Sequence, residues 1–118
     1  MATHNDIGKQ GEQLALDFLI KKGYKILATN YHYRKAEIDI IAQKDSILAI
    51  VEVKTRTSTA FGSPESFVGN KKIQLVLQAA NAFVDQHQLD LDISLDIISV
   101  VIGKTTEIDH LENAYYFF

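Results

Sequence analysis

Apolar residues recur with a helical period in two segments of the chain. Between residues 6 and 22, and again from about Asn70 to His87, they return at about 100° per residue, which predicts two helices with one buried face each. Asn70 is a suitable N-cap for the second helix. The residues expected on the buried faces are Ile7, Leu14, Ala15, Phe18 and Leu19 in the first helix, and Ile73, Val76, Leu77, Ala80, Phe83 and Val84 in the second.

Shorter segments rich in β-branched residues predict strands. A tight turn at residues 43–46 should join two of them as an antiparallel hairpin. The second helix would then be a crossover, so the strands on either side of it are expected to be parallel within a mixed sheet. The terminal aromatic residues 115–118 favour sheet closure or an oligomer interface over base stacking. The predicted strands are Tyr24 to about Tyr31, about 33–42, 47–54 and Ile93 to Ile102, with Ala114 to Phe118 as a candidate closing strand.

Charged residues appear abruptly at the end of an apolar strand. The segment 47–51 has no polar residue, so both of its faces should be buried, and Glu52 and Lys54 follow it. Alternation along a strand places these two side chains on one face, and Glu37 and Asp39 share a face of the neighbouring strand by the same rule. Charges among isoleucines and valines are costly unless a cation or a reaction uses them, which makes this group a candidate site. A solvated hairpin face is the alternative.

Glu12 is a third candidate carboxylate. Its neighbours on the helix surface are Gly8, Ala15, Leu16 and Leu19, so it lies within the apolar arc rather than on the polar face. The glycines at 8 and 11 lower helix propensity but leave space beside Glu12 for another backbone or a ligand. A carboxylate at the edge of the arc that reaches solvent or a lysine is the alternative interpretation.

This order of residues resembles a known superfamily. A Glu on the first helix, an Asp on a strand and Glu-x-Lys on the next strand are similar to the PD-(D/E)xK nucleases, which have a restriction-endonuclease-like fold. From Gly8 to about Val101, the chain more closely resembles the YraN-like uncharacterised protein family (UPF0102), small bacterial proteins of that superfamily. The motifs that carry the resemblance are Gly8-x-x-Gly11-Glu12, Asn30-Tyr31, Ala36 to Ala42, Val51 to Arg56, Phe61 to Pro64, and Lys71.

The resemblance implies a fold, a cofactor and roles for individual residues. The fold would be α/β, with a mixed sheet flanked by helices in the order αβββαβ. Asp39, Glu52 and the backbone carbonyl of Val53 would ligate Mg²⁺ or Mn²⁺, which are hard ions that prefer oxygen donors. Lys54 would orient or deprotonate the attacking water, or stabilise the charge that develops on phosphorus. Glu12 would hold a second-shell water or part of a second metal. The expected activity is hydrolysis of nucleic-acid phosphodiester bonds.

The chain departs from the family pattern at two positions. Ala36 stands where the family usually has Gly, which matters only if that backbone needs a positive φ. Ser94-Leu95-Asp96 replaces the common Arg-Phe-Asp, so Asp96 matches but the arginine is missing.

Two other functions stay open: a nucleic-acid-binding module without catalysis, and a structural or partner-binding protein with a buried ion-pair network.

Composition and charge narrow the range of partners. The 118 residues suit one domain (1–118), and the absence of cysteine suits a reducing cytoplasm. No signal peptide or membrane span is expected. The four histidines are scattered along the chain and do not suggest a zinc site. The sequence leaves the oligomeric state open, and a homodimer is one option. Residues 1–72 hold eleven Lys and Arg against eight Asp and Glu, whereas 73–118 hold one against seven. The basic part favours a nucleic-acid partner, DNA over RNA, with candidate phosphate contacts at Arg34, Arg56, Lys71 and Lys72.

Overall fold

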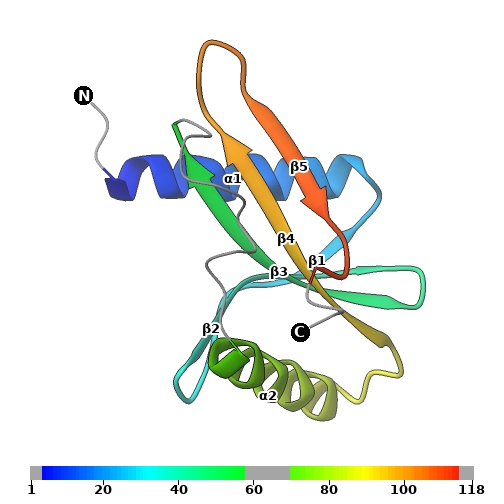
Figure 1. Cartoon of the computed structure of the whole chain (residues 1–118). Coiled ribbons are helices and arrows are strands. Elements are labelled where there is room, and N and C mark those ends of the chain that lie inside the picture. The colour runs from blue at the N-terminus through cyan, green and yellow to red at the C-terminus, as the bar shows by residue number, and fades with distance from the viewer. Residues whose placement is uncertain (1–3, 58–69, 115–118) are drawn as a thin grey trace.

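A computed structural model describes residues 4–57 and 70–114 (Figure 1). The predicted α/β class and the order αβββαβ are confirmed, and one further strand follows. Within the described ranges, neither helix is both long and apolar enough to cross a membrane. The elements are α1 (His4–Lys21), β1 (Lys25–Tyr33), β2 (Ala36–Lys44), β3 (Ile47–Arg56), α2 (Asn70–His87), β4 (Asp92–Val101) and β5 (Glu107–Leu111).

The described strands form one mixed sheet in the order β1-β2-β3-β4-β5. The β2–β3 hairpin is antiparallel, and its turn is at Asp45 and Ser46, as the sequence predicts. Strands β3 and β4 pair in parallel along their whole length, from Ile47 with Asp92 to Arg56 with Val101. The helix α2 makes the crossover between them, which confirms the predicted parallel pairing.

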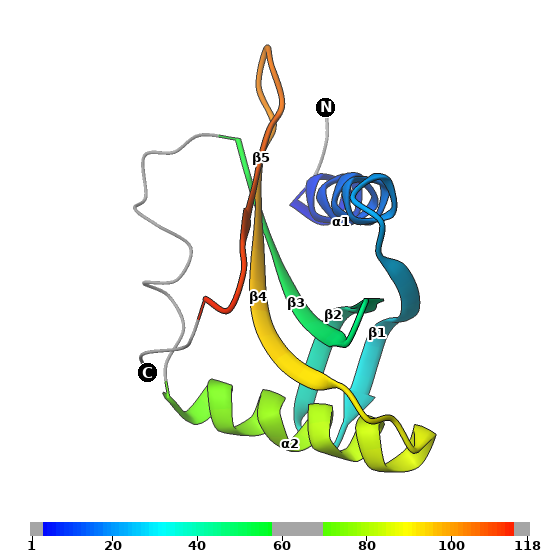
Figure 2. The ribbon, with the colours of Figure 1, turned by 90° about the vertical axis from the view of Figure 1, so that its right-hand side faces the viewer.

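The two helices lie on opposite sides of the sheet (Figure 2). Helix α1 packs Ala15 and Leu19 against a core that includes Val51 and Ile98, and we call this the α1-side core. Helix α2 packs its predicted apolar face against the other side of the sheet, which we call the α2-side core; all six residues expected on that face belong to it. Four of the five residues expected on the buried face of α1 pack into the α1-side core, and Ile7 does not.

The sequence did not predict β5. Among the described strands it is at the edge of the sheet and pairs with β4, and it alternates between half-buried and exposed residues, so its apolar signal is weak. The candidate closing strand from Ala114 to Phe118 lies almost wholly outside the described residues. Ala114 itself is in a turn, where its backbone N–H donates to the carbonyl of Leu95 at 2.7 Å. The edge position on β4 therefore belongs to Glu107–Leu111.

The pairing of β1 with β2 is interrupted at two points. Its register shifts between Ile26 and Ala28, and farther along, with the register unchanged, it passes from Thr29–Ile40 to Tyr31–Ile38 and leaves out Asn30 and Asp39. Asn30 has a φ of 50°, in the left-handed region that asparagine tolerates better than most residues. Across this point the alternation of faces changes, because Ile38 packs into the α2-side core and Ile40 into the α1-side core. Asp39 thus lies where β2 changes the face that it presents.

Candidate functional site

Asp39 lies at an opening in the sheet between β2 and β3. The β2–β3 pairing ends at Ile40 with Val51, and beyond it β3 continues alongside β4, with no other described strand paired to it. The backbone N–H of Val53, which would otherwise face this opening, donates to Oδ2 of Asp39 at 2.8 Å. The Asp39 side chain therefore takes the place of a backbone acceptor from a neighbouring strand. This hydrogen bond holds the Asp39 carboxylate beside the backbone of β3, the strand that carries Glu52 and Lys54.

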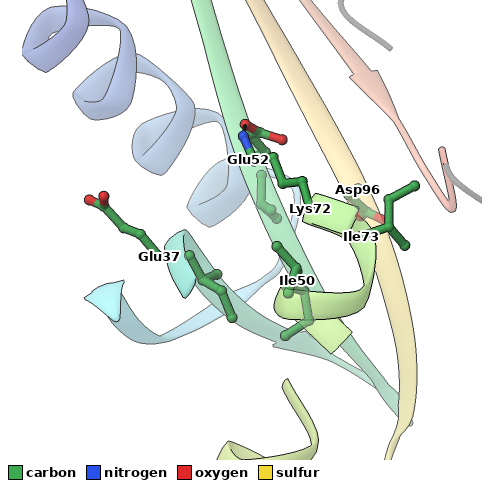
Figure 3. A pocket seen from close by; sticks show the side chains of 9 residues that line it. Glu37, Ile50, Glu52, Lys72, Ile73 and Asp96 are labelled. Carbon is green, nitrogen blue, oxygen red and sulfur yellow. Dashed lines mark hydrogen bonds and ion pairs between the residues drawn. The ribbon is translucent and has the colours of Figure 1, made fainter. Parts of the chain in front are cut away.

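Glu52 and Lys54 occupy one face of β3, on the side of α2. The Nζ atom of Lys54 is 3.1 Å from Oε1 of Glu52, as expected for residues i and i+2 of a strand. The same Oε1 atom forms an ion pair with Nζ of Lys72, which comes from the first turn of α2. Figure 3 shows the Glu52 and Lys72 side chains meeting in front of β3. One carboxylate oxygen is therefore shared by two ammonium groups from different elements.

Asp39 lines two hollows, one on each side of the sheet. The first, of about 300 Å³, lies toward α2 and is also lined by Glu37, Glu52 and Lys72. The second, of about 180 Å³, lies toward α1 and is also lined by Glu12. Glu12 and Glu52 thus approach Asp39 from opposite faces, and the opening between β2 and β3 brings both within electrostatic range of it.

Burial and mutual repulsion act on the three carboxylates differently. Burial, with repulsion from Glu12, Glu52 and Glu37, raises the pKa of Asp39 to about 6, although its hydrogen bond from Val53 opposes the shift. Burial and the charge of Glu37 also raise the pKa of Glu12. Burial alone would raise the pKa of Glu52, but Lys72 and Lys54 outweigh it and hold that pKa below its ordinary value. The folded protein therefore stabilises the charged form of Glu52 and destabilises the charged forms of Asp39 and Glu12.

Close packing of α1 on β3 positions Glu12. A methyl group added at Gly11 would overlap with the side chain of Thr55, whereas one added at Gly8 would meet no atom within 4 Å. Gly11 thus allows the helix to approach the strand at the residue that follows Lys54. Of the two glycines that the sequence singled out, only Gly11 makes this contact, and Glu12 follows it directly on the half-buried side of the helix.

The donor set suits a small, hydrated cation. Asp39 and Glu52 offer carboxylate oxygens beside an open hollow, and the backbone N–H of Val53 holds Asp39 in place. Nowhere in residues 4–57 and 70–114 do three or more His, Cys, Asp or Glu side chains gather closely enough to enclose a metal ion. Mg²⁺ keeps several waters and commonly takes only one or two protein carboxylates, so the residues present fit that ion.

The remaining predicted residues are placed at different distances from this centre. Lys71 is exposed in the first turn of α2, and Arg56 ends β3. Arg34 is not part of the site, because it lies in the β1–β2 turn over the ring of Tyr33, at 5.3 Å. Glu37 lines the larger hollow, but its carboxylate points away from Glu52 (Figure 3) and lies 3.7 Å from His32.

A second polar cluster, not foreseen from the sequence, surrounds the buried Asp96. Oδ2 of Asp96 is 2.8 Å from Nε2 of His110, and Oδ1 accepts hydrogen bonds from Ser94 and from the backbone of Asn113. Nδ1 of His110 is in turn 2.8 Å from Nζ of Lys22. Ser94 thus contributes a hydroxyl hydrogen bond to Asp96 from the same strand. The only signal in the sequence was an aspartate within an apolar strand.

The chain is similar to known proteins over nearly its whole length. The model of the uncharacterised protein family UPF0102 matches residues 11–100. The chain belongs to this family. UPF0102 proteins similar to it include FP2501 of Flavobacterium psychrophilum, with 57% identity over the full length of both chains, and one from Christiangramia forsetii, with 44% identity over the full length of both. Another, from Phocaeicola vulgatus, has 44% identity over 98% of this chain and 97% of its own.

The UPF0102 match includes every residue at the centre of the candidate site. It begins at Gly11, directly before Glu12, and contains Asp39, Glu52 and Lys54. It also contains Lys72, whose contact with Glu52 was not expected from the sequence. The centre of the candidate site therefore lies within the part of the chain that matches the family.

Proposed function

We propose that this UPF0102 protein is a metal-dependent nuclease with a restriction-endonuclease-like core, which hydrolyses phosphodiester bonds of nucleic acid. The observation that supports this most is the meeting of Asp39, Glu52 and Lys54 where β2 and β3 separate. Two carboxylates beside an open hollow, with a lysine paired to one of them, can support metal-assisted hydrolysis of a phosphodiester.

A divalent cation would be held by Asp39, Glu52 and the carbonyl of Val53. When bound, Mg²⁺ or Mn²⁺ supplies Lewis acidity toward the scissile phosphate and lowers the pKa of a bound water. The raised pKa of Asp39 supports this assignment, because positive charge at this place would relieve the repulsion among its carboxylate neighbours. Glu12, on the opposite side of Asp39, would orient water in the smaller hollow.

Lys54 would act on the reacting phosphate. Its ammonium is held by Glu52 at 3.1 Å and is only 27% exposed, so its position is well defined. In that position it can orient the attacking water or stabilise charge that develops on phosphorus. Arg56 and Lys71 lie farther along β3 and at the start of α2, where they would contact the phosphate backbone rather than the reacting group.

Cleavage assays on purified protein test this proposal. Branched, duplex and single-stranded DNA and RNA would be incubated with Mg²⁺, Mn²⁺ or EDTA, and DNA is the expected substrate. We expect cleavage only with a divalent ion, and Lys54→Ala should lower its rate by about 10²-fold or more while leaving affinity for the substrate nearly unchanged. Lys104→Ala, an exposed lysine beyond β4, is the matched control and should cleave as wild type does.

Phosphate contacts should behave differently from Lys54. Arg56→Ala and Lys71→Ala should weaken binding evenly across sequences and lower the slope of its salt dependence by about one unit each. Binding with steep salt dependence but no cleavage under any metal would contradict the proposal and support a binding module. Neither binding nor cleavage would support a partner-binding role.

A further inference from the structure

Lys72 contacts the acidic centre from a different element than Lys54. Both ammonium groups contact the same Oε1 atom of Glu52, and Glu52 is only 20% exposed. Lys54 is fixed two residues farther along the same strand, whereas Lys72 extends from the first turn of α2 and is 46% exposed. Of the two cations, Lys72 is the more exposed, so its ammonium has more open space into which it can move away from Glu52.

The charges around Glu52 differ from those around Asp39. Glu52 faces two positive groups, but Asp39 faces Glu12, Glu37 and Glu52 and accepts its hydrogen bond from a neutral backbone N–H. A cation held between Asp39 and Glu52 would lie close to Nζ of Lys72, because that atom contacts Glu52 directly. Two cations at such a separation repel each other strongly in a partly buried site.

We propose that Lys72 competes with the divalent cation for Glu52, and that the released ammonium then binds a phosphate group of the nucleic acid. This inference rests on the proposed function. The larger hollow gives this exchange room, because Lys72 and Lys35 line it together with Glu37, Asp39 and Glu52. With a divalent cation bound, the positive charges of the ion and the two lysines would outnumber the three carboxylates, which suits an anion. Lys72 would thus be a phosphate-binding residue that becomes available only when the metal site is filled.

The exchange makes binding of the cation and of nucleic acid mutually favourable. A metal that displaces Lys72 frees a positive group for phosphate, and a phosphate that holds Lys72 leaves Glu52 ready for the metal. By linkage, each ligand must raise the affinity for the other by the same factor. If Lys72 is replaced by an uncharged residue, the metal should bind more tightly in the absence of nucleic acid. Nucleic acid should then raise the affinity for the metal by a smaller factor than in wild type.

Calorimetric titration of Mn²⁺ into the metal-free full-length protein tests the competition directly. Lys72→Met keeps the apolar stem and removes the charge, and Lys71→Met removes the same charge at the adjacent position. We expect Lys72→Met to lower the Kd for Mn²⁺ by about five- to twentyfold, because the Lys72 ammonium contacts Glu52 directly. Lys71→Met should change the Kd by about twofold or less, because Lys71 is exposed and solvent screens its charge. Lys72→Arg, which keeps the charge, should stay close to wild type.

A second titration measures the coupling. Fluorescence anisotropy with a phosphorothioate duplex, which resists cleavage, would give DNA affinity with and without Mn²⁺. The gain in affinity caused by Mn²⁺ should be larger in wild type than in Lys72→Met by about the factor found calorimetrically. Equal Mn²⁺ affinity in Lys72→Met and Lys71→Met, or weaker affinity in Lys72→Met, would overturn the inference and leave the nuclease proposal intact. No Mn²⁺ binding by any form would overturn both.

Discussion

Asp39 carries the largest electrostatic penalty among the residues of the candidate site. Its carboxylate is partly buried, faces three other acidic side chains, and accepts a hydrogen bond from the backbone of Val53. Its pKa of about 6 exceeds the value of an unfolded chain, so ionisation of Asp39 destabilises the folded state. The stability that comes from keeping this group protonated is fully present at pH values below the unfolded pKa and is lost as pH rises through about 6.

The first prediction concerns this penalty. In EDTA at pH 7.5, Asp39→Asn should raise the free energy of unfolding by on the order of 1–2 kcal/mol, since the amide can still accept the hydrogen bond of Val53 without a charge. At pH 4 the difference should nearly vanish. Urea unfolding at several pH values would measure it, with Asp85→Asn, an exposed carboxylate of α2, as the control. A variant less stable than wild type at pH 7.5 would contradict the assigned pKa.

The second prediction is that a divalent ion removes the same penalty. With Mg²⁺ or Mn²⁺ at ten times its Kd, the fold should gain about 1.4 kcal/mol, a rise in Tm of about 3–6 °C. Asp39→Asn should abolish the gain, because the amide is a poor ligand for a hard cation. Thermal melts with and without the ion would show it. An equal gain in Asp39→Asn would mean that the ion binds elsewhere.

At the scale of elements, the site depends on two local departures from regular structure. The β1–β2 pairing omits Asn30 and Asp39, and α1 approaches β3 closely at Gly11. Together they place a carboxylate from the sheet and one from a helix on either side of the same hollow. A regular ladder with side chains at every helix position would keep these two groups apart.

The third prediction tests the approach of α1 to β3. Gly11→Ala should lower the free energy of unfolding by about 1–3 kcal/mol despite the better helix propensity of alanine, because the new methyl group overlaps with Thr55. Gly8→Ala, which meets no atom within 4 Å, should instead raise it by about 0.5–1 kcal/mol. Chemical denaturation would measure both. Similar effects of the two substitutions would contradict the close packing at Gly11.

The periodicity of apolar residues predicts most of the helices and strands, and particular residues show which features it does not predict. Both helices have a strong apolar stripe, and the hairpin has a short turn, so their positions follow from local chemistry. Glu52 and Lys54 share a face because alternation requires it. The contact of Lys72 with Glu52 depends on how α2 is placed over the sheet, and the positive φ of Asn30 depends on pairing between strands. Neither has a local signal.

At the scale of the whole molecule, the cluster around Asp96 joins parts that are distant in the sequence. Lys22 follows the end of α1, Asp96 belongs to β4, His110 to β5, and Asn113 to the turn beyond it. His110 also packs edge-on against the rings of Phe18 and Tyr24. Burial would raise the pKa of Asp96, but the hydrogen bonds from His110, Ser94 and Asn113 hold it below its ordinary value.

The fourth prediction follows from this cluster. Asp96→Asn should lower the free energy of unfolding at pH 7 by about 2–4 kcal/mol, since it leaves His110 and its neighbours with a weaker buried acceptor. A lowered pKa contributes stability above the unfolded value and loses it as pH falls, so the difference between variant and wild type should shrink toward pH 3. Urea unfolding across this range would measure it. Asp109→Asn, exposed on the same edge strand, should be close to neutral.

The parallel pairing of β3 with β4 also affects how the chain acquires its structure. Strand β3 has the uncharged stretch Ile47 to Val51, and its second edge is covered only when Asp92 to Asp96 arrive from the far side of α2. Until then a partly folded chain presents an apolar edge with unpaired backbone groups, which is a template for association with other chains. Slow steps and losses to aggregation during refolding should therefore depend on the docking of α2 and β4, and dilute protein should refold in better yield than concentrated protein.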